Sequence, residues 1–318
     1  REAGRAGGLM VTTAWEHDAV SRTLREHERR GEIELAVVGL GARGVIEAAD
    51  VLARCEPRTV AVVLSGASNV TGALVDVGAI GRGLRDRWGA GREKPWLVVD
   101  AAQSGGLVEH DVEGDGIDLL AVSGHKALRG PSGTGALLVG STVADDALVP
   151  TRFGGTGQTA WADEGLDEDA MPLELPERLE AGTPNVPGLA GWREAMRELG
   201  GSLTERREVM AGRLAHERRL VGVFTEGLRG RDKVRVVSGP ARAARPEAFT
   251  GVVSVVVEGM TPGEVAGVLG ASMGITVRAG LHCAPWAHRA LGTHALGGTV
   301  RVSFGTTSTE ADAVACAR

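Results

Sequence analysis

The 318-residue sequence contains no tyrosine, only three cysteines and no apolar run that approaches the length of a membrane span. Cys55, Cys283 and Cys316 form neither an even disulfide framework nor the paired spacing of a zinc site. The opening residues, REAGRAGGLM, lack the apolar stretch of a secretory signal. These absences predict a protein of a reducing compartment, which we take to be the cytoplasm, with no metal and no membrane partner.

The charge balance is also unfavourable for nucleic-acid binding. The formal net charge is −6 and the pI is about 5.8, and arginines are scattered among acidic residues instead of clustered. Hydrophobic residues make up 43% of the chain, which is enough for a large core in a globular protein. At this length we expect two domains.

The stretch from Trp96 to Val139 carries the strongest pattern. Short, continuous apolar runs at Trp96–Asp100 and Ile117–Val122 are typical of strands buried on both faces of a parallel sheet. Strands and helices alternate before this stretch, which predicts a mostly parallel sheet with helices on both faces. Ligands of such sheets collect at the carboxyl ends of the strands, so Asp100 and Lys126 are expected to meet at one ligand.

A lysine and an aspartate at one site indicate pyridoxal phosphate. The lysine amine forms a Schiff base with the aldehyde, and the acid keeps the pyridine nitrogen protonated so that the ring accepts electrons. From spacing alone, the alternative remains open that Lys126 is a surface lysine paired with a strand-end aspartate.

Three motifs in this stretch carry a resemblance to a known family. They are Asp100-Ala101-Ala102-Gln103, Ser123-Gly124-His125-Lys126 and Gly130-Pro131-Ser132-Gly133-Thr134-Gly135. The chain resembles the class V aminotransferases, in particular the branch of cysteine desulfurases and selenocysteine lyases. The resemblance implies that Asp100 pairs with the pyridine nitrogen, Gln103 hydrogen-bonds the phenolic oxygen, Ser123 and His125 hold the phosphate, and Lys126 forms the Schiff base.

Further cofactor-binding residues are implied by the same resemblance. His17, at a strand-to-helix turn, matches the histidine that stacks on the pyridoxal ring, and Asn69 matches an asparagine near the cofactor and substrate. Thr156 and Thr183 lie in segments that flank the cofactor in the family, one of which reaches the phosphate of the neighbouring subunit, which implies a homodimer. The residues alone allow a helix-start histidine and ordinary turns.

Cys283 lies in the segment Arg278-Ala279-Gly280-Leu281-His282-Cys283-Ala284, which is too irregular for a strand or helix. Such a setting predicts a mobile, accessible thiol, and a neighbouring imidazolium would increase its thiolate fraction. The segment resembles the active-site loop of desulfurases, with Cys283 at the persulfide position. Two alternatives are a structural cysteine and a metal site made by His282, Cys283 and His288.

Arg301, within Thr299–Gly305, resembles the family's arginine that grips the substrate carboxylate, a planar anion that suits a guanidinium. A structural ion pair is the alternative. The family continues with an aromatic-Asn-Thr turn, whereas this chain has Thr306-Thr307-Ser308-Thr309. That difference leaves the turn's contact unassigned.

The resemblance implies fold type I of the pyridoxal phosphate enzymes, an α/β fold whose mostly parallel sheet is sandwiched by helices. We expect a large cofactor-binding domain over 1–187, a connecting helical region over 188–201 and a smaller α/β domain over 202–318. Thr261-Pro262-Gly263-Glu264 predicts a helix start within the smaller domain.

Relatives generally carry several dozen residues before the position that matches Arg1, including a phosphate-binding Gly-Thr-Thr turn at a helix N-terminus. This chain does not contain that turn. We therefore expect the sequence to be an amino-terminally truncated form of an enzyme, which would bind its cofactor poorly.

The resemblance implies a cysteine desulfurase that converts L-cysteine to L-alanine, leaves a persulfide on Cys283 and passes the sulfur to an acceptor protein that the sequence does not identify. Selenocysteine cleavage, transamination and another β-elimination stay open, because one scaffold supports several reactions. A non-catalytic remnant is the alternative outside enzymology.

Overall fold

The computed structural model describes residues 7–41, 43–91, 93–155 and 171–318. Its larger sheet has the strand order β2-β1-β3-β4-β5-β6. The strands are β1 (Gly8–Thr13), β2 (Ile33–Val38), β3 (Thr59–Ser65), β4 (Trp96–Asp100), β5 (Leu119–Ser123) and β6 (Gly135–Val139). All pairs are parallel except β5 with β6, so the prediction of a mostly parallel sheet is confirmed.

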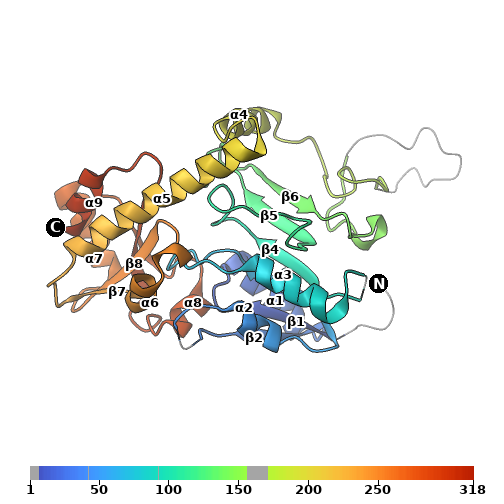
Figure 1. The fold of residues 1–318 in the computed structure, drawn as a ribbon, viewed down its shortest axis with the longest axis horizontal. Helices are drawn as coiled ribbons and strands as arrows, with labels where there is room; N and C mark the ends of the chain where they lie inside the picture. Colours follow the sequence, from blue (N-terminus) through green and yellow to red (C-terminus); the bar gives the residue numbers. More distant parts are fainter. Residues whose placement is uncertain (1–6, 42, 92, 156–170) are drawn as a thin grey trace, which may run out of the picture.

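Helices α1 (Asp18–Arg29), α2 (Ala48–Ala53) and α3 (Val77–Trp88) connect the parallel strands, and Figure 1 shows them beside the blue and cyan part of the sheet. Val11, Val62 and Leu97 are fully buried, as expected for strands covered on both faces. They join the α3 side chains Ile80 and Leu84 in one core cluster. The apolar runs form strands because each can bury both of its faces.

The second sheet is formed after residue 233 and has the order β7-β8-β10-β9. Its strands, β7 (Val234–Val236), β8 (Val252–Val257), β9 (Arg278–Gly280) and β10 (Thr299–Ser303), are all antiparallel to their neighbours. A separate core joins β8 and β10 to α5 (Leu203–Gly227) and α9 (Glu310–Ala317). The two sheets and two cores fit the expected pair of domains, whose boundaries remain predictions.

Helix α5 runs from α4 (Val186–Arg197) to the second sheet (Figure 1). The sequence predicts mainly helix from Val186 to Glu217, whereas the structure has two helices separated at Gly200 and Gly201. Ser202 begins α5 with a capping box, in which its hydroxyl accepts from the Glu205 backbone N–H and the Glu205 side chain accepts from the Ser202 backbone N–H. The same motif starts α7 (Pro262–Met273), with Thr261 at the cap and Glu264 as its partner.

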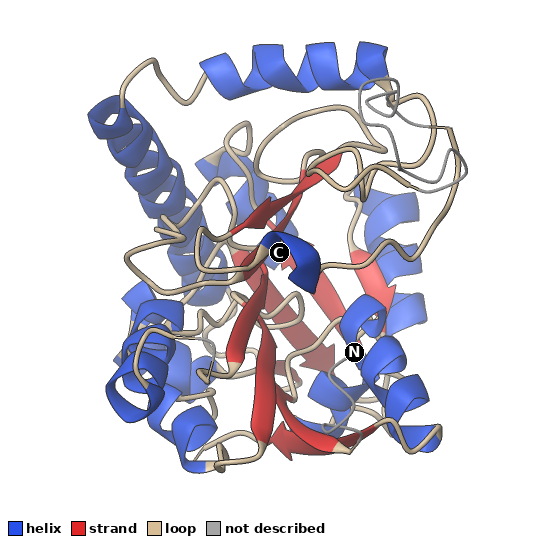
Figure 2. Ribbon diagram, turned by 90° about the vertical axis from the view of Figure 1, so that its right-hand side faces the viewer, coloured by secondary structure: helices blue, strands red, loops and turns tan. Residues whose placement is uncertain are grey.

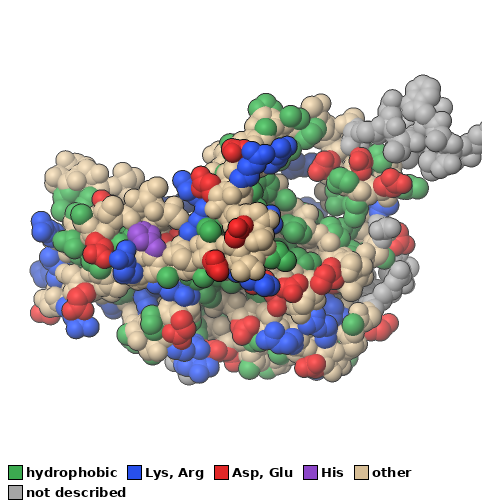
Figure 3. Space-filling model, turned by 45° about the horizontal axis from the view of Figure 1, so that its top comes forward, with side chains coloured by type: hydrophobic (Ala, Val, Ile, Leu, Met, Phe, Trp, Pro, Cys, Tyr) green, Lys and Arg blue, Asp and Glu red, His purple; other side chains and the backbone are tan. Residues whose placement is uncertain are grey.

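Three short helices were not predicted: α6 (Gly239–Ala244), α8 (Pro285–Ala290) and α9. Figure 2 shows helices on both flanks of the strands that cross the middle of the molecule. Among the described residues, no helix is both long and apolar enough to cross a membrane. On the face in Figure 3, acidic and basic side chains are interspersed, as the composition indicates.

Candidate active site

The carboxyl ends of three neighbouring strands place the predicted residues at one edge of the larger sheet. Asp100 ends β4 and lies in register with Ser65, the last residue of β3. Its Oδ1 accepts a hydrogen bond from the Ala102 backbone N–H at 2.9 Å, which fixes the turn that carries Gln103. Ser123 ends β5, and Lys126 follows three residues later. The strand ends carrying Asp100 and Ser123 therefore lie at one edge of the sheet, and the shared ligand of Asp100 and Lys126 stays a prediction.

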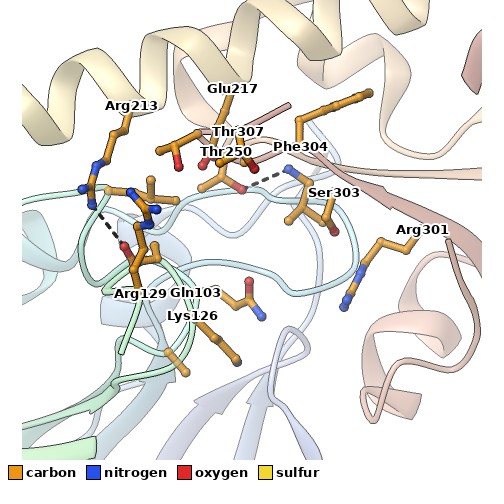
Figure 4. A pocket seen from close by; sticks show the side chains of 16 residues that line it. Gln103, Lys126, Arg129, Arg213, Glu217, Thr250, Arg301, Ser303, Phe304 and Thr307 are labelled. Atoms are coloured by element: carbon orange, nitrogen blue, oxygen red, sulfur yellow. Dashed lines mark hydrogen bonds between the residues drawn. The ribbon is translucent and has the colours of Figure 1, made fainter. Parts of the chain in front are cut away.

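Lys126 and Gln103 line a cavity of about 440 Å³ between the two sheets. Figure 4 shows Arg301 reaching the same space from β10, opposite Gln103 and Lys126. Away from Lys126 the cavity continues past Arg129, Arg213, Glu217, Thr250 and Thr307. The lining thus combines residues of the large sheet, helix α5 and the second sheet.

Burial is the main influence on the Lys126 amine. Desolvation lowers the pKa of Lys126, the negative charge of Asp100 opposes this shift, and Arg301 and Arg278 add to it. A half-buried lysine with a lowered pKa has more of the uncharged, nucleophilic form.

His17 caps helix α1, its Nδ1 accepting a hydrogen bond from the Ala19 backbone N–H at 3.1 Å. Burial and then Lys126 lower the pKa of His17, while Asp100 and Asp18 oppose the shift. His17 is therefore both a helix-start histidine, as the alternative interpretation expected, and a neighbour of the Asp100–Lys126 pair.

Glu16, which the sequence did not indicate as a site residue, is fully buried against Ser65 at the end of β3. Its carboxylate accepts hydrogen bonds from the Thr13 hydroxyl at 2.6 Å, the Ser65 hydroxyl at 2.8 Å and the Ser65 backbone N–H at 3.2 Å. Desolvation raises the pKa of Glu16 to about 7 despite these bonds, and Asp100 contributes in the same direction. The sequence signal that could have identified Glu16 is an acidic residue shortly after the buried strand β1.

Asn69 and Arg301 join the turn after β3 to the second sheet. Arg301 donates from Nη1 to the Asn69 backbone carbonyl at 3.0 Å, and the Asn69 side-chain amide donates to the His282 carbonyl at 2.7 Å. Asn69 Oδ1 and Arg301 Nε are buried and have no hydrogen-bond partner among the described residues. An acceptor and a cationic donor thus remain available at the meeting of the two sheets.

Cys283 lies in a turn between β9 and α8, outside any helix or strand, but the first part of the segment predicted to be irregular, Arg278–Gly280, forms β9. His282 and Cys283 have φ of 53° and 57°, a left-handed conformation that costs a residue with a side chain roughly 1–2 kcal/mol. The Cys283 carbonyl accepts from the Asp18 backbone N–H at 2.7 Å, which ties the turn to the start of α1.

The expected imidazolium beside the thiol is wrong. Burial lowers the pKa of His282 to about 3, with Arg301 and His288 adding to the shift, so this imidazole is neutral near pH 7. The cation that contacts the sulfur is Arg278, whose guanidinium donates to Cys283 Sγ at 3.4 Å. Arg278 lies five residues before Cys283 in the sequence, but the sequence pattern alone did not indicate a role for it.

The other two cysteines have different surroundings. Cys55 is buried, and desolvation raises its pKa to about 11, as an inert thiol requires. Burial also raises the pKa of Cys316, in helix α9. The described residues contain no group of three potential metal ligands, which disfavours the metal alternative for His282, Cys283 and His288.

The residues predicted to hold a phosphate are less closely connected. Ser123 Oγ and His125 Nδ1 are 3.3 Å apart. Thr183 is exposed in the loop before α4, and the backbone N–H of the preceding residue, Gly182, donates to the Gly155 carbonyl at 2.6 Å. Thr156 lies outside the described residues.

Comparison with protein families gives one match that spans the chain, the Aminotransferase class-V model over residues 1–315. A probable cysteine desulfurase of Methanothermobacter thermautotrophicus is 32% identical over 302 residues, covering 94% of this chain and 69% of the relative. A probable cysteine desulfurase 2 of Mycobacterium leprae is 33% identical, covering 95% of this chain and 66% of the relative. The chain thus spans about two thirds of these relatives.

Among solved structures, the apo cysteine desulfurase of Thermococcus onnurineus superposes with a TM-score of 0.79 at 30% identity. The match covers 96% of this chain and 70% of that protein. A cysteine desulfurase of Escherichia coli, with a TM-score of 0.76 and 24% identity, shares the fold. The predicted α/β fold is therefore confirmed by structural neighbours as well as by the sheet itself.

Proposed function

The chain belongs to the class V aminotransferase family, and from this premise we propose that it is a pyridoxal phosphate-dependent cysteine desulfurase. The reaction would convert L-cysteine to L-alanine and leave a persulfide on Cys283. The relatives and the structural neighbour named above support this choice within the family. The observation that carries the proposal is the cavity that Lys126 and Arg301 line together, with the Cys283 turn joined to Arg301 through Asn69.

The residues present fit pyridoxal phosphate. The unpartnered Oδ1 of Asn69 and the lowered pKa of Lys126 are features that a bound polar group with an aldehyde would use. Asp100 would hold the pyridine nitrogen, Gln103 the phenolic oxygen, and Ser123 with His125 the phosphate, while His17 would cover the ring. When bound, the cofactor supplies an electron sink for the bonds at the substrate Cα.

The cavity residues supply binding and proton transfer. Arg301 would grip the substrate carboxylate through its guanidinium, whose Nε has no hydrogen-bond partner among the described residues. The Lys126 amine, whose pKa is lowered by burial, would take the proton from the substrate Cα, because an uncharged amine is the form that accepts a proton.

Cys283 would carry out the sulfur transfer. Its thiolate attacks the substrate sulfur, an S–S bond forms, the Cβ–S bond of the substrate breaks, and Cβ gains a proton to give alanine. Arg278, 3.4 Å from Sγ, places a positive charge where the thiolate forms. An acceptor protein or a small thiol then removes the outer sulfur from Cys283.

We also propose that the protein acts as a homodimer in the cytoplasm. Thr183 is exposed and lies in one of the two family segments of which one reaches a neighbouring subunit, which supports the dimer. The stretch between β6 and α4 also exposes apolar side chains, such as Phe153, at 78% of its full exposure, and Leu173, at 61%, which a second subunit would bury.

Alanine release from L-cysteine by Cys283→Ser tests the proposal. With excess pyridoxal phosphate, we expect the variant to bind cofactor like the parent and to release alanine at least about 100-fold more slowly, since the nucleophile is absent. Mass analysis after one turnover should find the persulfide on the Cys283 peptide of the parent. Cys55→Ser and Cys316→Ser are the matched controls, and a persulfide on Cys55 or full alanine yield from Cys283→Ser contradicts the proposal.

A further inference from the structure

A chain of buried hydrogen bonds leads from the Cys283 turn into the second sheet and back to the large sheet. His282 Nε2 lies 2.9 Å from the Thr299 hydroxyl, which lies 3.1 Å from the Ser254 hydroxyl. The Ser254 hydroxyl lies 2.6 Å from the Val70 backbone carbonyl. Thr299 and Ser254 are fully buried and His282 is 3% exposed, so water does not replace these bonds.

The Val70 carbonyl, at the end of this chain, fixes the direction of each hydrogen bond in it. A backbone carbonyl only accepts, so the Ser254 hydroxyl donates to Val70. The Thr299 hydroxyl then donates to Ser254, and its lone pair must be matched by a donor from His282. His282 therefore carries its hydrogen on Nε2, while Nδ1, which is buried and has no partner among the described residues, stays bare.

Two further bonds hold the backbone of the same turn. Asn69 donates to the His282 carbonyl at 2.7 Å, and the Asp18 N–H donates to the Cys283 carbonyl at 2.7 Å. Both bonds hold backbone carbonyls, and neither contacts the His282 side chain. The His282 ring is anchored by the hydrogen-bond chain through Thr299 and Ser254, and it also packs against the His288 ring, with the ring centroids 5.4 Å apart.

We propose that His282 is a positioning residue for Cys283, held as the neutral Nε2–H tautomer by the chain Thr299–Ser254–Val70. This inference deepens the proposed function and rests on the role assigned there to Cys283. The anchored ring keeps the turn in its left-handed conformation, with Cys283 Sγ against Arg278. His282 thus acts through the backbone of the turn and not as a proton donor to the sulfur.

The charges around the ring agree with a neutral imidazole. Burial lowers the pKa of His282 to about 3, and the charged or titratable groups that act on it, Arg301, His288 and Arg278, all lower it further. The ring is consequently neutral near pH 7, and its tautomer is set by the hydrogen-bond chain.

The tautomer is measurable without substrate. In protein labelled with ¹⁵N at histidine, the two ring nitrogens of each tautomer have distinct chemical shifts, and His282→Gln assigns the His282 signals. We expect a protonated Nε2 and a bare Nδ1 in the parent between pH 6 and 8. A protonated Nδ1, or a doubly protonated ring, would overturn the proposal.

Thr299→Val removes the acceptor while preserving the shape of the side chain. We expect amide hydrogens of the Leu281–Ala284 peptide to exchange about tenfold faster, since a buried donor is left unpaired. Thr299→Ser keeps the hydroxyl and should exchange within twofold of the parent. The β4 peptide, Trp96–Asp100, should exchange equally in all three proteins, and unchanged exchange of the turn in Thr299→Val contradicts the proposal.

Ser254→Ala tests the direction of the bonds and serves if Thr299→Val does not fold. Without Ser254 the Thr299 hydroxyl becomes free to donate to Nε2, so we expect a measurable population of the Nδ1–H tautomer. If His282 has the same tautomer in Ser254→Ala as in the parent, the hydrogen-bond chain does not set the tautomer and the proposal is wrong. Neither the ¹⁵N chemical shifts nor the hydrogen exchange requires L-cysteine. A protein without desulfurase activity would therefore disprove the proposed function without deciding whether the hydrogen-bond chain positions His282.

Discussion

Lys126 differs from the chain's other two lysines at the scale of single residues. Lys94 forms a buried ion pair with Asp118 at 2.5 Å, near the start of β4 and away from the strand ends that carry Asp100. Lys233 is exposed just before β7. Only Lys126 combines a place in the cavity lining with a pKa lowered by burial.

Lys126→Ala should therefore abolish covalent attachment of pyridoxal phosphate. Borohydride fixes the cofactor on the lysine that forms its Schiff base, and peptide mass analysis identifies that lysine. We expect the label on Lys126 in the parent and essentially none in the variant. Recovery of the label mainly on Lys94 or Lys233 would remove Lys126 from its proposed role.

The predictable part of the site is the part set by parallel strands. Asp100 and Lys126 could be brought together from sequence because the ends of neighbouring parallel strands meet at one edge. The surroundings of Cys283 could not, because they depend on Asn69 and His282, which are 213 positions apart. The charge of His282 was mispredicted for the same reason, since its burial is created by β10 and the turn after β3 together.

At the scale of secondary-structure elements, two glycines inside helices distinguish the effect of side-chain packing on stability from that of helix propensity. Gly81 lies in α3, where an added Cβ would approach the Asp115 backbone carbonyl to 1.6 Å. Gly212 lies in α5, where an added Cβ meets nothing within 4 Å. The same substitution should therefore have opposite effects in the two helices.

Gly81→Ala should lower the free energy of unfolding by about 2–3 kcal/mol, because α3 must move away from a rigid backbone carbonyl. Gly212→Ala should raise it by about 0.5–1 kcal/mol through helix propensity. Urea unfolding followed by circular dichroism measures both. Stabilisation by Gly81→Ala would mean that α3 packs less closely against the loop at Asp115.

A local capping signal was used at one helix start, Thr261, and missed at two others, Ser202 and Thr309, which also begin helices with a capping box. The helix start at Thr261 needs only its hydroxyl, Pro262 and Glu264, all within four residues. The short helices α6 and α8 have six residues each, too few to show a periodic pattern. The separation of α4 from α5 occurs at Gly200, whose φ of 104° suits glycine and ends a helical stretch.

For the whole molecule, buried titratable groups make stability depend on pH in two opposing ways. Glu16 has its pKa raised by burial from 4.5 to about 7, so its contribution is complete below pH 4.5 and is lost as the pH rises through 7. His288 is fully buried, and its pKa is lowered from 6.5 to about 4. Its penalty is absent above pH 6.5 and grows as the pH falls toward 4.

Variants that remove one group should tilt the stability profile in opposite directions. Relative to the parent, Glu16→Gln should gain about 3 kcal/mol in unfolding free energy between pH 4.5 and pH 7, since the unfolded parent alone releases the Glu16 proton there. His288→Gln should gain about 3 kcal/mol as the pH falls from 6.5 to 4, since the unfolded parent alone gains a proton.

Urea unfolding at half-unit steps from pH 4 to pH 8 measures both differences, and groups common to parent and variant cancel. Between pH 4.5 and pH 6.5, where both groups contribute, the two difference curves should have slopes of opposite sign. The magnitude of each slope should not exceed about 1.4 kcal/mol per pH unit. Parallel curves would show that burial does not set these protonation states. A flat curve for Glu16→Gln alone would mean that Glu16 is ionised in the folded protein throughout this pH range.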